Sequence, residues 1–130
     1  MNIIQALQGK ENLLNGDGVE ESVVAAAERE LNLKFAADYR EYLLRMTIAA
    51  YDGHELTGLS KAVRTNVVEV TKQKWLECSK ISKSWYVIEE TNIDQIVIWQ
   101  SQDGKVYETI GGSEPVCVAD SMIAFVMNMK

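Results

Sequence analysis

The hydrophobic positions in the first third of the chain recur at the spacing of amphipathic helices. Apolar residues within positions 3–7 suit one face of a short opening helix. A longer stripe predicts a helix over residues 19–31, with Asp17 and Glu20 at the spacing of an N-terminal capping box. Asn32 suits the left-handed residue that commonly ends such a helix.

Two further helices are predicted between residues 36 and 78. A stripe of aromatic and aliphatic residues predicts a helix over residues 36–46 that buries this stripe in the core. Its members are Phe35, Tyr39, Tyr42, Leu43 and Met46. Asn66 and Glu69 again have capping-box spacing, and they predict a third long helix that extends through Trp75 to Cys78.

After residue 84 the pattern changes to that of β-strands. Runs rich in Val, Ile, Trp and Tyr predict strands over residues 85–89, 96–100 and 105–109. Asp103 and Gly104 can supply the positive φ angles of a tight hairpin between the second and third strands. We therefore expect an antiparallel meander of three strands.

Gly111, Gly112 and Pro115 are expected to end this sheet, and Asp120 is expected to cap a final helix. The inward-facing positions of that helix are Met122, Ile123, Val126 and Met129. The order of elements predicts an α+β fold with helices packed on one face of a mainly antiparallel sheet. A length of 130 residues predicts a single domain over residues 1–130.

Composition and cysteine usage indicate a soluble cytoplasmic protein. Apolar residues make up 47% of the chain and charged residues 25%, which is ordinary for a globular protein. No apolar run approaches the length of a membrane span, and residues 1–14 lack the basic region of a signal peptide. Cys78 and Cys117 form no CxxC pair, which favours free thiols in a reducing compartment.

The formal net charge of −6 argues against a nucleic-acid binder, because neutralising phosphates requires clustered Lys and Arg. The charge is unevenly distributed: residues 61–83 hold six bases and two acids, whereas residues 84–130 hold seven acids and two bases. Acidity of this kind either keeps a soluble protein dispersed or steers a cationic partner toward it. Both interpretations stay open on charge alone.

Catalytic and metal chemistry find little support in the sequence. His54 is the only histidine, and Asp52 and Glu55 are its nearest acids in the chain. These three could in principle bind a metal or move a proton, but no metal-binding spacing accompanies them. Gly111 and Gly112 lack the lysine of a phosphate-binding loop. We expect no enzyme activity, no cofactor and no metal, and keep an enzyme using His54 as a third hypothesis.

A protein-binding surface is the remaining possibility. Neighbouring strand residues point to opposite faces, so Glu89 and Glu90 cannot form a catalytic pair unless a bulge intervenes. Trp and Tyr carry much of the binding energy at interfaces, and acids attract cationic partners. The candidate partner-binding residues are Tyr51, Asp52, Glu89, Glu90, Asp94 and Trp99.

Several short segments, in order, resemble the SUKH superfamily, which includes fungal cell-wall assembly regulators and many bacterial immunity proteins. The opening pair reads Ala-Glu-Arg-Glu-Leu-Asn-Leu at residues 27–33 and Asp-Tyr-Arg-Glu-Tyr-Leu at residues 38–43. The later matching segments are residues 56–59, 66–71, 86–89, 93–98, 103–108 and 119–125. The family's usual Leu-Pro before Asp-Tyr-Arg is replaced here by Phe35-Ala36-Ala37.

The resemblance implies a non-enzymatic protein-binding domain. Its leading interpretation is an immunity protein that binds and neutralises a cognate bacterial toxin, for which a nuclease with a basic site would be a fitting target. The alternative is a regulatory or scaffolding module that binds a housekeeping protein. Neither interpretation involves a nucleic acid or a membrane as partner, and both leave the oligomeric state open.

Overall fold

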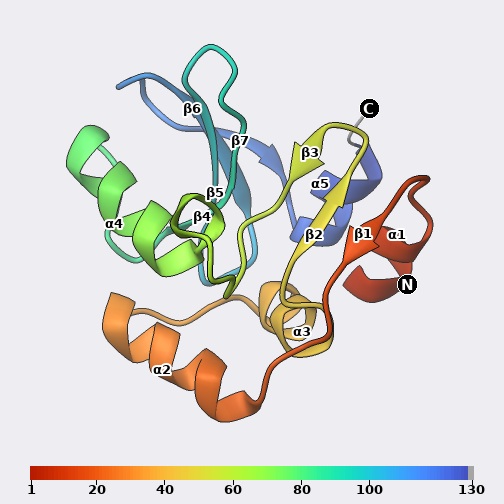
Figure 1. Ribbon diagram of the computed structural model, residues 1–130. Coiled ribbons are helices and arrows are strands. Elements are labelled where there is room, and N and C mark those ends of the chain that lie inside the picture. The colour runs from red at the N-terminus through yellow and green to blue at the C-terminus, as the bar shows by residue number, and fades with distance from the viewer. Residues whose placement is uncertain (129–130) are drawn as a thin grey trace.

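Two antiparallel sheets and the helices around them make up the fold of this computed structural model, which describes residues 1–128 (Figure 1). The α-helices are α1 Ile3–Gln8, α2 Glu21–Leu31, α3 Ala37–Arg45, α4 Val67–Glu77 and α5 Met122–Asn128, with a 3₁₀ turn η1 at Val63–Thr65. The strands are β1 Leu14–Asn15, β2 Ala49–Tyr51, β3 His54–Glu55, β4 Tyr86–Glu90, β5 Ile96–Gln100, β6 Val106–Ile110 and β7 Val116–Ala119.

The larger sheet has the strand order β4-β5-β6-β7, and every neighbouring pair is antiparallel. The expected meander of three strands is therefore confirmed, but the expectation that the sheet ends near Gly111 is wrong. Gly111 adopts φ 62° and the amide of Ser113 donates to the carbonyl of Ile110, so this segment turns the chain into β7. Gly111 therefore belongs to a turn, and after this turn the chain continues into a fourth strand of the sheet.

The smaller sheet, β1-β2-β3, was not predicted. Its strands are only two or three residues long, too short for an alternating pattern to be visible in the sequence. It joins the larger sheet through a single bridge between Leu56 and Glu89. This contact brings the β2–β3 hairpin alongside β4.

The predicted helices all form, but two of their predicted caps are wrong. Glu20 occupies the N-cap of α2 and makes no side-chain cap bond. The segment before it is held extended against the end of α3, where the amide of Gly18 donates to the carbonyl of Arg45. That pairing keeps Asp17 from folding over the first turn of α2. At the other end of α2, Asn32 has φ 56°, which confirms the predicted left-handed stop.

The last helix is not capped by Asp120. The amide of Ala124 donates to Oγ of Ser121 at 3.0 Å, and the amide of Met122 donates to Oδ2 of Asp38 at 2.7 Å. A carboxylate from α3 therefore meets the start of α5, where unpaired amides favour negative charge. Met122 and Val126 are buried as predicted, whereas the prediction for Met129 lies outside the described residues.

The helix α4 begins as predicted, with Asn66 as its N-cap. Oδ1 of Asn66 accepts hydrogen bonds from the amides of Val68 at 3.0 Å and Glu69 at 3.2 Å. This satisfies two of the amides that a helix leaves unpaired at its start. The cap fixes where α4 starts relative to β4, and therefore which α4 side chains face the sheet.

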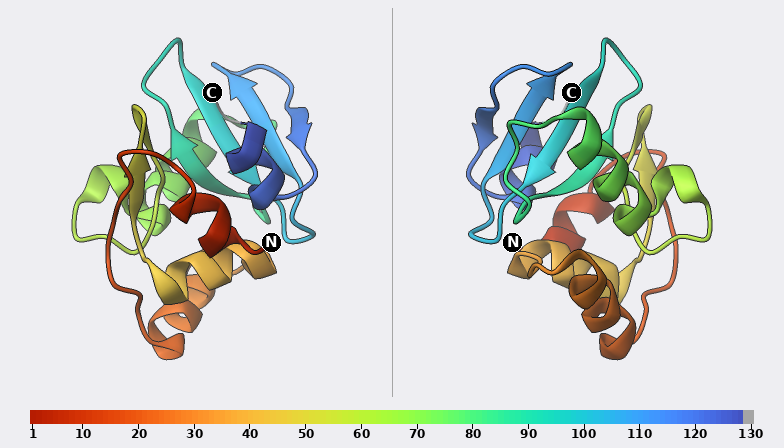
Figure 2. Two further views of the ribbon diagram at one scale, coloured as in Figure 1. Left: turned by 90° about the vertical axis from the view of Figure 1, so that its right-hand side faces the viewer. Right: turned by 90° about the vertical axis from the view of Figure 1, so that its left-hand side faces the viewer.

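The α+β class and the antiparallel sheet are confirmed. The expectation that the helices pack on one face only is wrong, because helices cover both faces of the larger sheet (Figure 2). On one face, Tyr86, Ile88 and Ile98 join the main core with residues of α1, α3 and α5. On the other, α4 packs over a smaller cluster. Its buried members are Val70, Cys78, Ile81, Val87, Val97 and Trp99. The strands β4 and β5 are therefore buried on both sides.

A β-bulge in β4 decides where its two glutamates point. Val87 lies opposite Trp99 and Glu89 lies opposite Ile98, so Ile88 is an extra residue without a partner of its own. Ile88 and Glu89 consequently both face the main core, and Glu90 turns to the side of α4. A regular strand would have placed these two glutamates the other way round.

Thr57 connects α3 to β4 through four hydrogen bonds. Its amide donates to the carbonyl of Ile88 at 2.9 Å, and its hydroxyl donates to the carbonyl of Val87 at 2.8 Å. The hydroxyl of Tyr39 lies 2.8 Å from Oγ1 of Thr57, and that of Tyr42 donates to the Thr57 carbonyl at 2.8 Å. Burial raises the pKa of each tyrosine far above the value of an exposed tyrosine, so both hydroxyls remain neutral hydrogen-bond donors.

Substituting Thr57→Val should lower the free energy of unfolding by about 2 kcal/mol or more, because it leaves a buried hydroxyl and a buried carbonyl without a partner. Urea denaturation measures the change. Thr57→Ser is the matched control, since it keeps the hydroxyl and removes only a methyl group. A Val variant that is as stable as the natural protein would show that the hydrogen bonds of the Thr57 hydroxyl do not contribute to stability.

Candidate functional site

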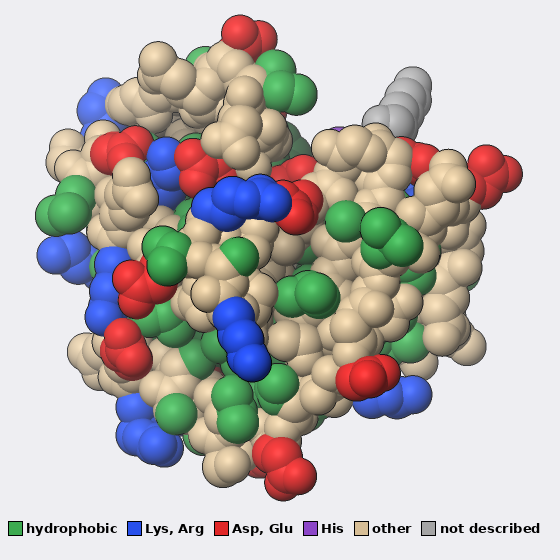
Figure 3. Space-filling view, in the orientation of Figure 1, with side chains coloured by type: hydrophobic (Ala, Val, Ile, Leu, Met, Phe, Trp, Pro, Cys, Tyr) green, Lys and Arg blue, Asp and Glu red, His purple; other side chains and the backbone are tan. Residues whose placement is uncertain are grey.

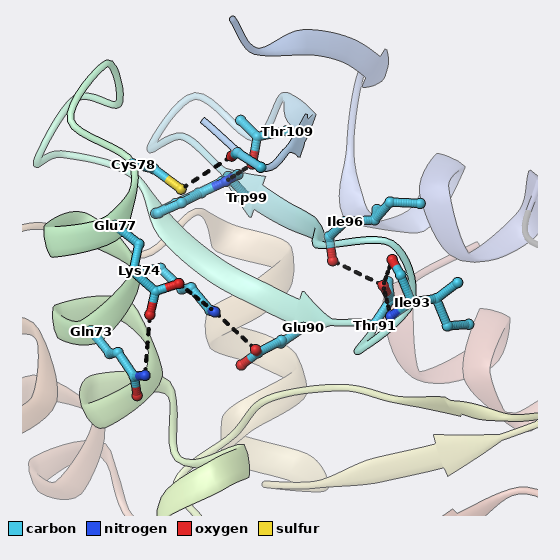
Figure 4. Close-up of polar contacts among 11 residues, drawn as sticks. Gln73, Lys74, Glu77, Cys78, Glu90, Thr91, Ile93, Ile96, Trp99 and Thr109 are labelled. Carbon is cyan, nitrogen blue, oxygen red and sulfur yellow. Dashed lines mark hydrogen bonds and ion pairs between the residues drawn. The ribbon is translucent and has the colours of Figure 1, made fainter. Parts of the chain in front are cut away.

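A groove of about 460 Å³ opens where the end of α4 meets the loops that follow β4 and β6. We call it the acidic groove. Its polar wall is formed by Lys74 and Glu77 of α4, Glu90 of β4 and Asp94 of the β4–β5 loop, while Cys78 and Gly111 also line it. Figure 4 shows Lys74 between the two glutamates. The groove is thus lined by one ammonium group and three carboxylates, and it is negatively charged.

Lys74 ties the two walls of the groove together. Its Nζ lies 3.0 Å from Oε1 of Glu77 and 2.9 Å from Oε1 of Glu90. Partial burial disfavours the ammonium form, but the hydrogen bonds with Glu90 and Glu77 outweigh it and raise the pKa of Lys74. The hydrogen bond from Lys74 lowers the pKa of Glu77. Lys74 and Glu77 therefore stay ionised at neutral pH, and the ion pairs hold the three side chains in place before any partner arrives.

The rim of the groove is a loop with an unusual backbone. Asn92, Asp94 and Gln95 have φ angles of 58°, 52° and 61°. Asn and Asp adopt this left-handed region more readily than other residues with a side chain. Oγ1 of Thr91 accepts from the amide of Ile93 at 3.1 Å and donates to the carbonyl of Ile96 at 2.9 Å, as Figure 4 shows. The exposed carboxylate of Asp94 is thereby carried on a structured turn.

The floor of the groove offers no reactive group. Cys78 is buried, and this burial raises the pKa of its thiol, so the thiolate is disfavoured. Its Sγ donates weakly to the carbonyl of Gly111 at 3.7 Å. Trp99 does not line the groove; it lies in the buried cluster under α4, is 0% exposed, and its Nε1 donates to Oγ1 of Thr109 at 3.0 Å. The groove can therefore present charge and shape, but its floor supplies no nucleophile.

A second cluster lies beside the β2–β3 hairpin. Nδ1 of His54 is 3.1 Å from Oε2 of Glu89, and the rings of His54 and Tyr51 are 5.6 Å apart. Glu89 is 2% exposed, and its Oε1 has no hydrogen-bond partner among residues 1–128. Burial raises the pKa of Glu89 against the opposing effect of His54. Burial also raises the pKa of Tyr51, with the Glu89 charge adding to the effect.

The six predicted partner-binding residues are divided between these two places. Glu90 and Asp94 line the acidic groove, and Asp52 is exposed at the hairpin turn with φ 46°. Tyr51, Glu89 and Trp99, in contrast, are 3%, 2% and 0% exposed. These three side chains are therefore not exposed contact residues, contrary to the prediction from the sequence.

Two residues of the groove were missed, Lys74 and Glu77. Their spacing of three along α4 is visible in the sequence and is typical of a helical ion pair. What the sequence does not show is that Glu90, sixteen positions after Lys74, meets the same ammonium group. That meeting depends on the bulge in β4.

The proposed association of His54 with Asp52 or Glu55 is not formed in the structure. His54 pairs with Glu89, and Glu55 binds Arg64, with Nη1 of Arg64 2.5 Å from Oε1 of Glu55. Within residues 1–128, no three His, Cys, Asp or Glu side chains cluster as metal ligands would. The arrangement therefore lends no support to the metal-based form of the third hypothesis.

Basic and acidic side chains are interspersed over the face seen in Figure 3, and no continuous basic stripe crosses that face. Binding to the phosphates of a nucleic acid requires such a stripe or patch. Of the helices in the described part of the chain, none is long and apolar enough to cross a membrane.

Comparison with known families identifies the chain. The SUKH_5 family model, described as SMI1-KNR4 cell-wall, matches residues 1–129. The chain belongs to the SUKH superfamily. This confirms the resemblance seen in the ordered sequence segments, and it places the chain in a family known for toxin-immunity and cell-wall roles.

Among solved structures, the SUKH domain is similar to the crystal structure of a protein from Pseudomonas syringae pv. tomato, with a TM-score of 0.73. The two chains are 16% identical over 98% of this chain and 94% of the other, so the similarity concerns the fold alone. No curated protein matches the chain significantly.

Substituting Glu89→Gln should change how stability depends on pH. The pKa of Glu89 is raised in the folded protein above its ordinary value of 4.5. Its contribution to stability is therefore present below that value and is lost as the pH rises through the raised pKa. The free energy of unfolding of the Gln variant relative to the natural protein should increase from roughly pH 4 to pH 7. Chemical denaturation at several pH values measures it.

The exposed Glu11 provides the control for this measurement, because Glu11→Gln removes a carboxylate that is not buried. The change with pH should be larger for Glu89→Gln than for this control variant. If the stability difference between the Glu89→Gln variant and the natural protein does not change with pH, this would contradict the interpretation that ionising the buried Glu89 lowers the stability.

Proposed function

We propose that this SUKH domain is a non-enzymatic binding protein whose partner is a cognate protein toxin, which it neutralises by occupying a basic surface of that toxin. The observation that carries the proposal is the acidic groove, which is lined by three carboxylates from α4, β4 and the β4–β5 loop and by one lysine that pairs with two of them. The toxin-immunity role found in the family supports it in kind.

The groove suits recognition because its charges are positioned before binding. Lys74 is only 12% exposed and holds Glu77 and Glu90 in fixed positions, so little side-chain freedom is lost when a partner docks. Asp94 stands on the rim, where a charge acts mainly on the rate of encounter. A partner's Arg or Lys can interact with Asp94 first and then compete with Lys74 for Glu90.

A toxin that acts on nucleic acid is a fitting partner. A nuclease must attract phosphates, so the surface around its active site is commonly basic. An acidic inhibitor can cover that surface by complementary charge. The net charge of −6 gives the SUKH domain a long-range attraction toward such a surface. The free thiols Cys78 and Cys117 fit action in the reducing cytoplasm, where an immunity protein would meet an incoming toxin.

The alternative is a regulatory module that binds a housekeeping protein, and it draws support from the cell-wall description of the matching family model. The two functions differ in what rescues growth. An immunity protein protects a cell that expresses the toxin-like product of the adjacent gene, whereas a regulatory module does not.

Removing the charge of the groove should weaken the complex with that toxin-like product. In the Glu90→Gln, Asp94→Asn double variant we expect the dissociation constant to rise about tenfold or more at low salt, because two attractive charges are lost. Asn is chosen at position 94 because it tolerates the left-handed backbone there. Calorimetry measures the affinity, and co-expression measures growth.

The matched control is the Asp17→Asn, Glu20→Gln double variant, which removes the same number of charges from exposed positions before α2. It should bind nearly as tightly as the natural protein. Equal losses in both double variants would mean that net charge alone matters and that the groove is not the contact surface. Absence of both complex and growth rescue would contradict the toxin-neutralising function.

A further inference from the structure

The strand β7 forms an open edge of the larger sheet. It pairs with β6 on one side, and no other strand within residues 1–128 pairs with its outer side (Figure 2). Three successive side chains of β7 are exposed: Val116 at 61%, Cys117, and Val118 at 41%. The edge therefore combines backbone groups that lack a strand partner with an apolar surface.

Open edges usually carry features that discourage pairing with another chain, such as charged side chains within the strand. None of the four residues from Val116 to Ala119 is charged. A register shift between Val106 and Tyr107 of β6 marks a bulge in the pairing with β7, and Pro115 precedes the strand. These features limit the length of a strand that can add here to a few residues, but they leave its centre accessible.

The charges lie just beyond the two ends of β7. Glu114 precedes it and Asp120 follows it, and both are exposed. Glu114 forms an ion pair with Lys80 at 3.3 Å, in which both side chains are more than half exposed. Such an exposed pair is weak, so a basic group from a partner can replace Lys80.

These flanking acids argue against a second copy of the chain as the occupant. If two β7 strands paired antiparallel with Val116 of each copy opposite Val118 of the other, Glu114 of one copy would lie directly opposite Asp120 of the other at both ends. Like charges at such positions in neighbouring strands destabilise the pair. Basic residues at the same positions of a different chain would be attracted instead.

We propose that the β7 edge binds an extended segment of a protein partner as an added strand, and that this segment is apolar at its centre with Lys or Arg at both ends. The backbone of β7 supplies the hydrogen bonds, Val116 and Val118 supply apolar contacts, and Glu114 and Asp120 select the basic ends. This inference goes beyond the acidic groove and does not depend on the partner being a toxin.

The probe is a seven-residue peptide, Lys-Thr-Val-Thr-Val-Thr-Lys, blocked at both ends. Titration into the ¹⁵N-labelled natural protein should shift the amide signals of β7 and slow their hydrogen exchange. The same peptide with Glu at both ends should bind at least tenfold more weakly, and a peptide with Pro in place of the central Thr should not slow the exchange.

A charge-swapped variant makes the test specific. Glu114→Lys with Asp120→Lys should reverse the preference, so that the Glu-flanked peptide binds more tightly than the Lys-flanked one. Unchanged amide signals away from β7 show that this variant is folded. The Asp17→Lys, Glu20→Lys variant alters charge by the same amount elsewhere, and it should keep the original preference.

Three results would overturn the proposal. The first is equal binding of all peptides, or of none. The second is a set of shifts around Glu90 and Asp94 without change in β7, which would assign the peptide to the acidic groove. The third is slow exchange of the β7 amides without peptide, together with dimers in sedimentation, which would assign the edge to a second copy of the chain.

Discussion

One buried threonine connects α3 to β4 through hydrogen bonds of its amide, hydroxyl and carbonyl groups. Thr57 receives the hydroxyls of Tyr39 and Tyr42 from α3 and donates to the carbonyls of two consecutive residues in the larger sheet. The next residue must be glycine, because a Cβ at Gly58 would lie 1.7 Å from the carbonyl oxygen of Thr47. Close backbone approach and a satisfied polar network thus occur at the same point.

The geometry of β4 then determines both chemical clusters. Adjacent strand residues point to opposite sides of the sheet, and the bulge at Ile88 decides that Glu89 faces the hairpin and Glu90 faces α4. Glu89 becomes a buried group with a raised pKa, paired with His54. Glu90 becomes the sheet's contribution to the acidic groove. A single extra residue in one strand therefore decides which of the two carboxylates is buried and which lines the groove.

The sequence predicted the parts of this structure that depend on local pattern. The stripe from Phe35 to Met46 is periodic and the runs in β4, β5 and β6 are rich in strand formers, so these elements were correctly assigned. The Asn66 cap was predicted because a cap involves neighbours in the chain. The family resemblance was also visible in ordered short segments, and the family model bears it out.

What depends on contacts between distant segments was not predictable. The bulge leaves no mark in composition, so Glu89 was selected as a surface residue although it is buried. Trp99 was also selected for the surface because nothing in the sequence showed that α4 covers the second face of the sheet. The pairing of Lys74 with Glu90 joins a helix to a strand, and the pairing of His54 with Glu89 joins two sheets.

The turns around the groove have a consequence for how such domains diverge. The loops that follow β4 and β6 contain residues with left-handed backbone conformations, and no residue of these loops belongs to either hydrophobic cluster. The left-handed residues are Asn92, Asp94, Gln95 and Gly111. Mutations that lengthen or recharge these loops leave the packed interior intact. Descendants of one ancestral gene can therefore acquire new binding preferences quickly, while inheriting the same scaffold around Thr57.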